Sequence, residues 1–234
     1  MEENHQQKEN LLSKKTINIF VGIYCVVWFL NSNSIPFWLI VSIPLIGLIF
    51  QRISNQNLTS IIKIDADKKD YNVPEFIMFP TLTIMLRLVL SFELESWKRL
   101  LPYSMTILIF ILLILFIIFK LPKVTVKKLL LALGPTIFTL FLFSYFSAYG
   151  INIYFDNSTP KVHQSVVIDK EESRGTGKAA ARRTYYAIVE PWGTFTEPNK
   201  IMISRTEFDS IQPGDVLEIE RHQGYFGVPW FKSI

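Results

Sequence analysis

The chain has 234 residues, of which half are hydrophobic, with a formal net charge of +4 and a positive mean hydropathy of +0.28. Charged residues make up only 19% of it, less than in an ordinary soluble domain, so the composition argues against a wholly soluble protein. The long apolar runs lie in residues 1–150, whereas residues 151–234 alternate polar and apolar positions. The expected fold is an α-helical multi-pass membrane domain followed by a C-terminal all-β domain.

The basic character belongs to the first part of the chain. Residues 151–234 hold ten Lys/Arg and eleven Asp/Glu, which leaves fourteen and nine in residues 1–150. Basic loops between apolar runs record membrane orientation, so membrane lipid is an expected partner and nucleic acid is not. The single cysteine, Cys25, excludes a disulfide within the chain.

The first 150 residues are divided into a polar tail and about five spans. Residues 1–16 form the tail, and the membrane domain covers 17–150. The first two spans form a hairpin with a turn at Asn31–Ser34, and each is short against the ~20 residues that a spanning helix needs, so a re-entrant hairpin is the alternative. The expected spans are 17–30, 37–50, 76–92, 104–119 and 129–149.

The third span carries a charge, Arg87. An arginine at a helix centre costs about 2.5–3.5 kcal/mol on insertion scales, and each Leu, Ile, Phe or Val returns about 0.3–0.6. The apolar residues of 76–92 therefore roughly offset the arginine. Insertion of this segment is marginal and depends on neighbouring helices.

Loop charge favours five spans over four. With the N-terminus inside, five spans place the basic residues of the tail, of the loop after residue 50 and of Lys120–Lys128 in the cytoplasm. Four spans would leave Lys120–Lys128 outside, although basic residues near the ends of spans usually lie in the cytoplasm. The N-terminus is therefore expected in the cytoplasm and the C-terminal domain in the periplasm. The amino-acid usage rich in Ile, Lys, Asn and Phe is typical of an AT-rich bacterium, so the expected location is a bacterial inner membrane.

The last third follows a short linker, residues 151–160, and forms the β-domain, residues 161–234. Turn signals separate five period-two segments, and Pro213-Gly214 fits a type II turn because Gly tolerates the positive φ of the second central position. Five short strands suggest a small barrel of the OB or SH3-like kind, or a sandwich. The expected strands are 162–170, 184–190, 200–204, 215–221 and 228–232.

The ending Pro213-Gly214-Asp215-Val216, followed by Gly224-x-x-Gly227, resembles the small C-terminal β-barrels of uncharacterised bacterial multi-pass membrane proteins. The resemblance covers only the last third of the chain. Its motif is a turn and implies no activity.

Arg87 is the foremost candidate for a functional residue. A buried cation can line an ion or substrate path. The alternative is that it extends to the lipid headgroups or neutralises Glu93 or Glu95 in the adjoining loop.

A second candidate is a basic contact patch in the loop after the first strand. Arg174-Gly-Thr-Gly-Lys178 lacks the first Gly and the final Ser/Thr of a phosphate-binding loop, so no nucleotide is expected. The alternative is solvated loop charge. The patch comprises Arg174, Lys178, Arg182 and Arg183.

A third candidate is an aromatic binding face formed by Trp192, Tyr225 and Trp230, against the alternative that these side chains fill the core of a small domain. The three histidines are scattered, and no catalytic motif occurs, so no metal, cofactor or catalytic residue is expected.

The expected function is non-enzymatic: an integral inner-membrane protein presents an extracytoplasmic β-domain to a protein or an envelope component. One alternative is a small transporter or channel subunit, which would need homo-oligomerisation because five spans are few and no internal repeat is visible. Another is an immunity protein against a membrane-acting toxin.

Overall fold

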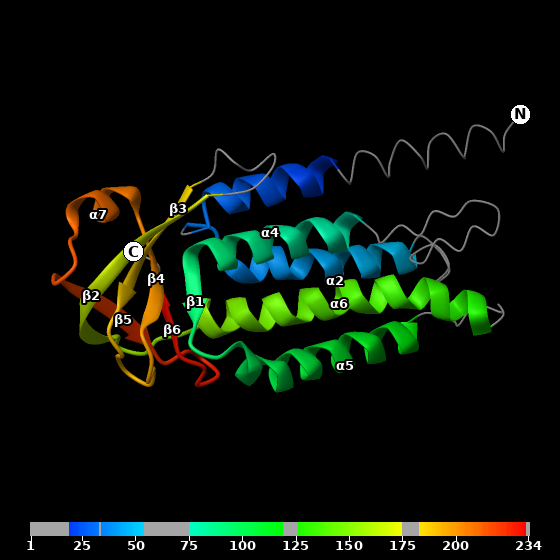
Figure 1. The fold of residues 1–234 in the computed structure, drawn as a ribbon. Helices are drawn as coiled ribbons and strands as arrows, with labels where there is room; N and C mark the ends of the chain where they lie inside the picture. Colours follow the sequence, from blue (N-terminus) through cyan, green and yellow to red (C-terminus); the bar gives the residue numbers. More distant parts are fainter. Residues whose placement is uncertain (1–18, 33, 54–74, 119–125, 175–182, 233–234) are drawn as a thin grey trace, which may run out of the picture. The chain divides into compact units, whose positions relative to one another are not determined.

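The structure, a computed structural model, describes residues 19–32, 34–53, 75–118, 126–174 and 183–232. The chain divides into two compact units. The helical unit comprises Met1–Leu88 and Lys98–Tyr154, and the β unit comprises Val89–Trp97 and Phe155–Ile234. The β unit is therefore assembled from two separate pieces of the chain (Figure 1).

The helical unit contains helices over all five ranges expected from the apolar runs. They are the helix Ile19–Leu30, α2 (Phe37–Ile53), α4 (Glu75–Ser91), α5 (Leu101–Ile118) and α6 (Val126–Tyr154), with a 3-10 turn, η1 (Trp97–Leu100), leading into α5. The expectation that the linker begins at residue 151 is wrong, because α6 continues to Tyr154. Its last turn remains uncharged and buries Asn152 and Ile153, which keeps it helical.

Close packing between α2 and α6 depends on a glycine. A Cβ atom at Gly150 would lie 2.0–2.7 Å from three ring carbons of Phe37, so only glycine fits there. The Phe37 ring stacks on Tyr154, with centroids 4.9 Å apart, and the fully buried Trp28 packs at a tilt against it. This cluster joins the first helix, α2 and α6.

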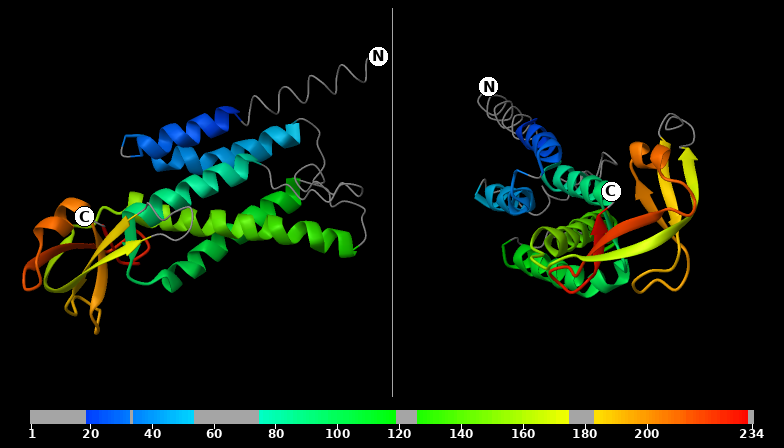
Figure 2. Two further views of the ribbon diagram at one scale, coloured as in Figure 1. Left: turned by 45° about the horizontal axis from the view of Figure 1, so that its top comes forward. Right: turned by 90° about the vertical axis from the view of Figure 1, so that its left-hand side faces the viewer.

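The β unit is a curled, antiparallel six-stranded sheet, a half-barrel, with the strand order β1-β6-β5-β2-β3-β4 (Figure 2). All five strands expected from the sequence are present, and a sixth, β1, was not expected. The strands are β1 (Phe92–Leu94), β2 (Lys161–Arg174), β3 (Arg183–Val189), β4 (Asn199–Ile203), β5 (Val216–His222) and β6 (Trp230–Lys232). Pro213-Gly214 forms the expected turn: Gly214 has φ +98°, and the Asp215 N–H donates to the Gln212 carbonyl.

The longest strand, β2, connects the two halves of the sheet. Residues 161–166 pair with β5, and Val167 and the residues from Asp169 onward pair with β3, with a register shift between Val167 and Asp169. Such an irregularity bends a strand and increases its twist, which curls the sheet. The strand continues beyond residue 170, where the sequence predicted its end, because residues 171–174 pair with 183–186.

The sixth strand, β1, comes from the connection between α4 and α5. It pairs with β6 in antiparallel register, Glu93 opposite Phe231. A short helix, α7 (Arg205–Ser210), follows β4 and begins with a capping box between Ser204 and Glu207.

The core of the half-barrel consists of side chains from the concave face of the sheet together with Trp192. Tyr185, Phe195, Phe208 and Ile211 cover its margin. The fully or nearly fully buried members are Val167, Ala187, Val189, Trp192, Ile201, Ile203, Leu217, Ile219 and Phe231.

Candidate functional site

A largely buried ion pair of the β unit joins β5 to Glu95, the residue that follows β1. Arg221 Nη2 lies 2.7 Å from Glu95 Oε2, and Arg221 Nε donates to the same oxygen at 2.8 Å. The Glu95 side chain is only 9% exposed and that of Arg221 19%. The other carboxylate oxygen accepts a hydrogen bond from the Thr194 hydroxyl. Both oxygens of Glu95 are therefore bonded, as a buried carboxylate requires.

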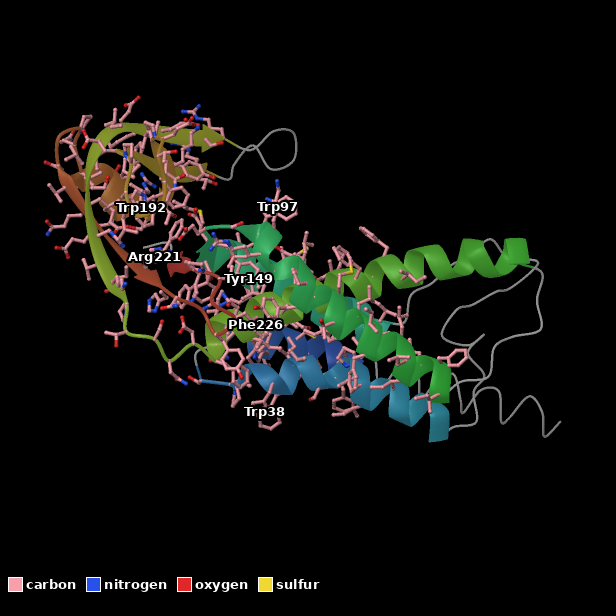
Figure 3. All side chains as sticks on the ribbon, turned by 90° about the horizontal axis from the view of Figure 1, so that it is seen from below. Trp38, Trp97, Tyr149, Trp192, Arg221 and Phe226 are labelled. Carbon is pink, nitrogen blue, oxygen red and sulfur yellow. The ribbon has the colours of Figure 1, made fainter. Side chains whose placement is uncertain are left out.

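Two aromatic side chains lie near this ion pair: Trp192, which is buried, and His163, which is half-buried. The rings of His163 and Trp192 are 5.6 Å apart, and a Cβ on Gly193 would contact both Arg221 and His163 at 3.9 Å. Figure 3 labels Trp192 and Arg221 within the β unit. We name Glu95, His163, Trp192, Thr194 and Arg221 the polar cluster.

The polar cluster has unused hydrogen-bonding capacity. His163 Nε2 and Trp192 Nε1 are buried, and neither has a hydrogen-bond partner among the described residues. Buried polar atoms are generally satisfied by protein, water or ligand. These two atoms are therefore the part of the cluster that a water molecule or a polar group could still satisfy. Among the described residues, no group of three or more His, Cys, Asp or Glu side chains is arranged to hold a metal ion.

Glu93 connects the two outer strands of the curled sheet. Its carboxylate accepts a hydrogen bond of 3.3 Å from the backbone N–H of Met202, so a side chain of β1 reaches β4 at the opposite edge. Burial raises the pKa of Glu93 above its usual range, and the bond from Met202 only partly offsets this. The outer edge of a sheet is a site for unwanted strand pairing, and Glu93 occupies one N–H of that edge.

Asp156, which lies two residues after the end of α6, binds three hydrogen-bond donors of the β unit. Its carboxylate accepts hydrogen bonds of 2.8 Å from the Gly224 N–H and from Trp230 Nε1, and also from the Ser158 N–H. Burial by itself would raise the pKa of Asp156, but the bonds from Ser158, Trp230 and Gly224 outweigh it and hold the pKa below its usual range.

Arg87, the foremost candidate from the sequence, lies in α4 four residues before the helix ends at Ser91. Its side chain is half-buried. Glu95, one of the acids that the sequence suggested as its partner, is paired with Arg221 instead. The structure places Arg87 in the helical unit and the polar cluster in the β unit.

The basic patch is only partly described. Lys178 and Arg182 lie outside the described residues. Arg174 and Arg183 face each other across β2 and β3, and Glu172 forms ion pairs with both, at 3.1 and 3.3 Å. The acid lowers the net positive charge of the described part.

The three aromatic candidates do not share one face. Trp192 is a core residue, packed edge-on against Phe231, and Trp230 is buried and stacks on His222. Tyr225 is 61% exposed. The alternative reading, that these side chains fill the core of a small domain, holds for the two tryptophans.

Sequence reasoning did not identify Glu93, Glu95, Asp156 or Arg221 as site residues. Phe92-Glu93-Leu94-Glu95 alternates with period two, but four residues between two apolar runs are too few to indicate a strand. Glu93 bonds to a group 109 residues away, Glu95 pairs with Arg221 126 residues away, and Asp156 bonds to Trp230 74 residues away. No local pattern indicates such contacts. The capping box of α7 did have a local signal, Ser204-x-x-Glu207.

Comparisons with protein-family models, with curated proteins and with solved structures found no match to this chain.

Proposed function

We propose that this chain is an integral protein of a bacterial inner membrane, whose helices anchor and orient a β half-barrel that binds a protein or envelope component outside the cytoplasm. No catalytic role is proposed. The surface of the helical unit, the insertion of β1 and the charge of the loops support a membrane-anchored binding protein.

The surface of the helical unit supports a membrane location most directly. Most of the large exposed hydrophobic side chains among the described residues belong to its helices, such as Phe20, Ile109 and Phe116. Its buried side chains, in contrast, include several small polar ones. A water-soluble helical bundle has the opposite distribution, whereas small polar residues between helices and large apolar residues outside are typical of membrane bundles.

Helix length agrees with this reading. Trp97–Ile117 and Ile137–Tyr154 are the two described helices that are long and apolar enough to cross a bilayer, and 22% of the first and 50% of the second are buried. A core helix of a soluble protein with the same hydropathy would be largely buried. Three further apolar helices are shorter: Ile19–Leu30, Phe37–Gly47 and Ile77–Ser91.

The pairing of β1 with β6 constrains the topology. Because β1 and the C-terminal strands form one sheet, they lie on the same side of the bilayer, and α5 and α6 between them cross it as a hairpin. Five crossings then place the half-barrel outside, with Lys120–Lys128 in the cytoplasm.

Three chain connections join the half-barrel to the helices: from α4 into β1, from β1 towards α5, and from α6 towards β2. The polar cluster, with its two unsatisfied buried atoms, is the proposed place for a polar group of the partner.

The proposal is tested by joining a phosphatase or a fluorescent protein to Ile234 and by cross-linking the chain to its neighbours in intact cells. We expect an active phosphatase, a dark fluorescent protein and one cross-linked partner that is lost when Trp192 is changed to Phe. Release of the chain by alkaline carbonate would overturn the membrane assignment, and the absence of any cross-linked partner would overturn the binding role.

The transporter and immunity alternatives remain predictions. The hydroxyls of Thr81 and Thr83, which a permeation path could use, donate to the carbonyls of Ile77 and Phe79 in their own helix.

A further inference from the structure

We propose that the turn Gly224–Gly227 of the half-barrel inserts Tyr225 into the lipid headgroup region, so that the bilayer surface itself holds the β unit in place. The inference rests on the proposed membrane location of α6. It concerns a lipid contact that is independent of any protein partner.

Residues Gly224–Gly227 form a tight turn. The Gly227 N–H donates to the Gly224 carbonyl at 2.9 Å, and both glycines adopt positive φ, +79° and +70°. Tyr225, the first residue inside the turn, is 61% exposed. An exposed aromatic ring gains free energy when another surface covers it.

The turn is fixed to the chain that leaves α6. Asp156, two residues after the helix ends at Tyr154, accepts hydrogen bonds from the Gly224 N–H and from Trp230 Nε1. Ser158 Oγ accepts from the Gln223 N–H at 3.1 Å. These three bonds hold both the entry to the turn and the strand after it.

A contact between two aromatic rings also links the turn to the end of α6. Phe155, the first residue after α6, is 42% exposed and lies edge-to-face with Tyr225, with centroids 6.3 Å apart. If α6 crosses the bilayer, covalent continuity places Phe155 where the helix leaves the hydrocarbon. Tyr225, in contact with it, must lie at the same depth.

The chemistry of the pair suits this depth. Tyrosine is enriched at membrane interfaces because its ring is apolar and its hydroxyl is polar. Trp97, which begins the apolar helix Trp97–Ile117, is also exposed. Since β1 and β2 belong to one sheet, the aromatic residues at Trp97 and at Phe155 and Tyr225 lie on the same side of the bilayer.

The test measures the depth of single labelled cysteines in vesicles. Cys25, the only cysteine, is replaced by Ala, and new cysteines are introduced one at a time as Tyr225→Cys, Glu218→Cys and Ile109→Cys. Each is labelled with an environment-sensitive fluorophore and reconstituted in phosphatidylcholine vesicles. Nitroxide groups are carried either on the lipid headgroup or deep in the acyl chain.

We expect the label at residue 225 to emit at shorter wavelength than that at residue 218 and to be quenched by the headgroup nitroxide. Residue 218, exposed on β5, serves as the aqueous control, and residue 109, exposed on α5, should be quenched by the acyl-chain nitroxide. Adding Asp156→Asn should reduce quenching at residue 225, because the turn loses its attachment, while quenching at residue 109 stays unchanged.

The outcomes separate the two proposals. Quenching at residue 109 without quenching at residue 225 would overturn the lipid contact and leave the membrane location standing. No quenching at residue 109 would overturn both. Equal quenching at residues 218 and 225 would show that the whole β unit lies near the lipid, and would also overturn a contact specific to the turn.

Discussion

Glu93 and Glu95 lie two residues apart, and removing their charges should have opposite effects on stability. Changing Glu95 to Gln removes the anion that both Arg221 donors share. Breaking a buried ion pair costs about 3–5 kcal/mol when one charge is left unpaired. Arg221 keeps some contact with water, so we expect a smaller loss, about 2–3 kcal/mol.

Changing Glu93 to Gln should leave the β unit as stable as before or make it more stable at neutral pH. The amide oxygen can still accept from the Met202 N–H, and the charge that burial disfavours is gone. Since the pKa of Glu93 is raised in the folded state, its contribution to stability is largest below its unfolded pKa, about 4.3, and is lost as the pH rises through the higher folded value. The Gln variant should lose this dependence.

Hydrogen exchange of the β5 and β6 amides, measured on the full chain in lipid nanodiscs, reports the free energy of local opening. The loss expected for Glu95→Gln corresponds to a decrease in protection of roughly 30- to 150-fold. Glu171→Gln is the matched control, because Glu171 pairs with Lys200 on the surface, where an ion pair contributes at most about 1 kcal/mol. Protection in Glu95→Gln equal to that in Glu171→Gln would refute the assignment of the buried pair.

Three further changes test other contacts. Gly150→Ala should lower the melting temperature of the chain in detergent, because overpacking against Phe37 costs about 1–3 kcal/mol, and adding Phe37→Leu should partly restore it. Gly22→Ala is the control, because a Cβ at Gly22 would have nothing within 4 Å, and it should not lower the melting temperature. Equal melting temperatures of the Gly150 and Gly22 variants would contradict the packing. Asp156→Asn should weaken the protection of the Gly224 amide from hydrogen exchange at neutral pH. In the wild type this protection should fall only below about pH 4, because the ionised carboxylate, whose pKa is lowered in the folded state, stabilises the fold until it is protonated. Unchanged protection in the variant would contradict the role of the carboxylate. Gly214→Ala should lower the free energy of local opening around the turn by about 1–2 kcal/mol, because a residue with a side chain is strained at φ +98°. An unchanged opening free energy would exclude that strain.

The helices and five of the six strands could be predicted because their signals are local. Apolar runs without charge, such as Leu101–Ile118, indicate helices by length and composition alone. Pro213-Gly214 predicted one turn, and the alternation of Leu217 and Ile219 with acidic residues predicted β5. Each of these patterns lies within a window of a few residues.

The insertion of β1 and the polar cluster could not be predicted, because they depend on contacts distant in sequence. Glu95 and Arg221 are 126 residues apart, and each taken alone resembles a solvated charge. The tryptophans were candidates for a surface face because composition does not determine which side of a strand or loop faces the core. Both tryptophans are buried by contacts distant in sequence, Trp192 with Phe231 and Trp230 with Asp156.

The central claim, a membrane-anchored half-barrel outside the cytoplasm, is tested most directly by labelling single cysteines in intact cells with a membrane-impermeant maleimide. In a Cys25→Ala background, Arg99→Cys reports the residues between β1 and α5, and Glu218→Cys reports the C-terminal strands; both native side chains are exposed. The account predicts that both are labelled without permeabilising the cells. Labelling of both only after permeabilisation would place the half-barrel in the cytoplasm, and labelling of one without the other would contradict the shared sheet.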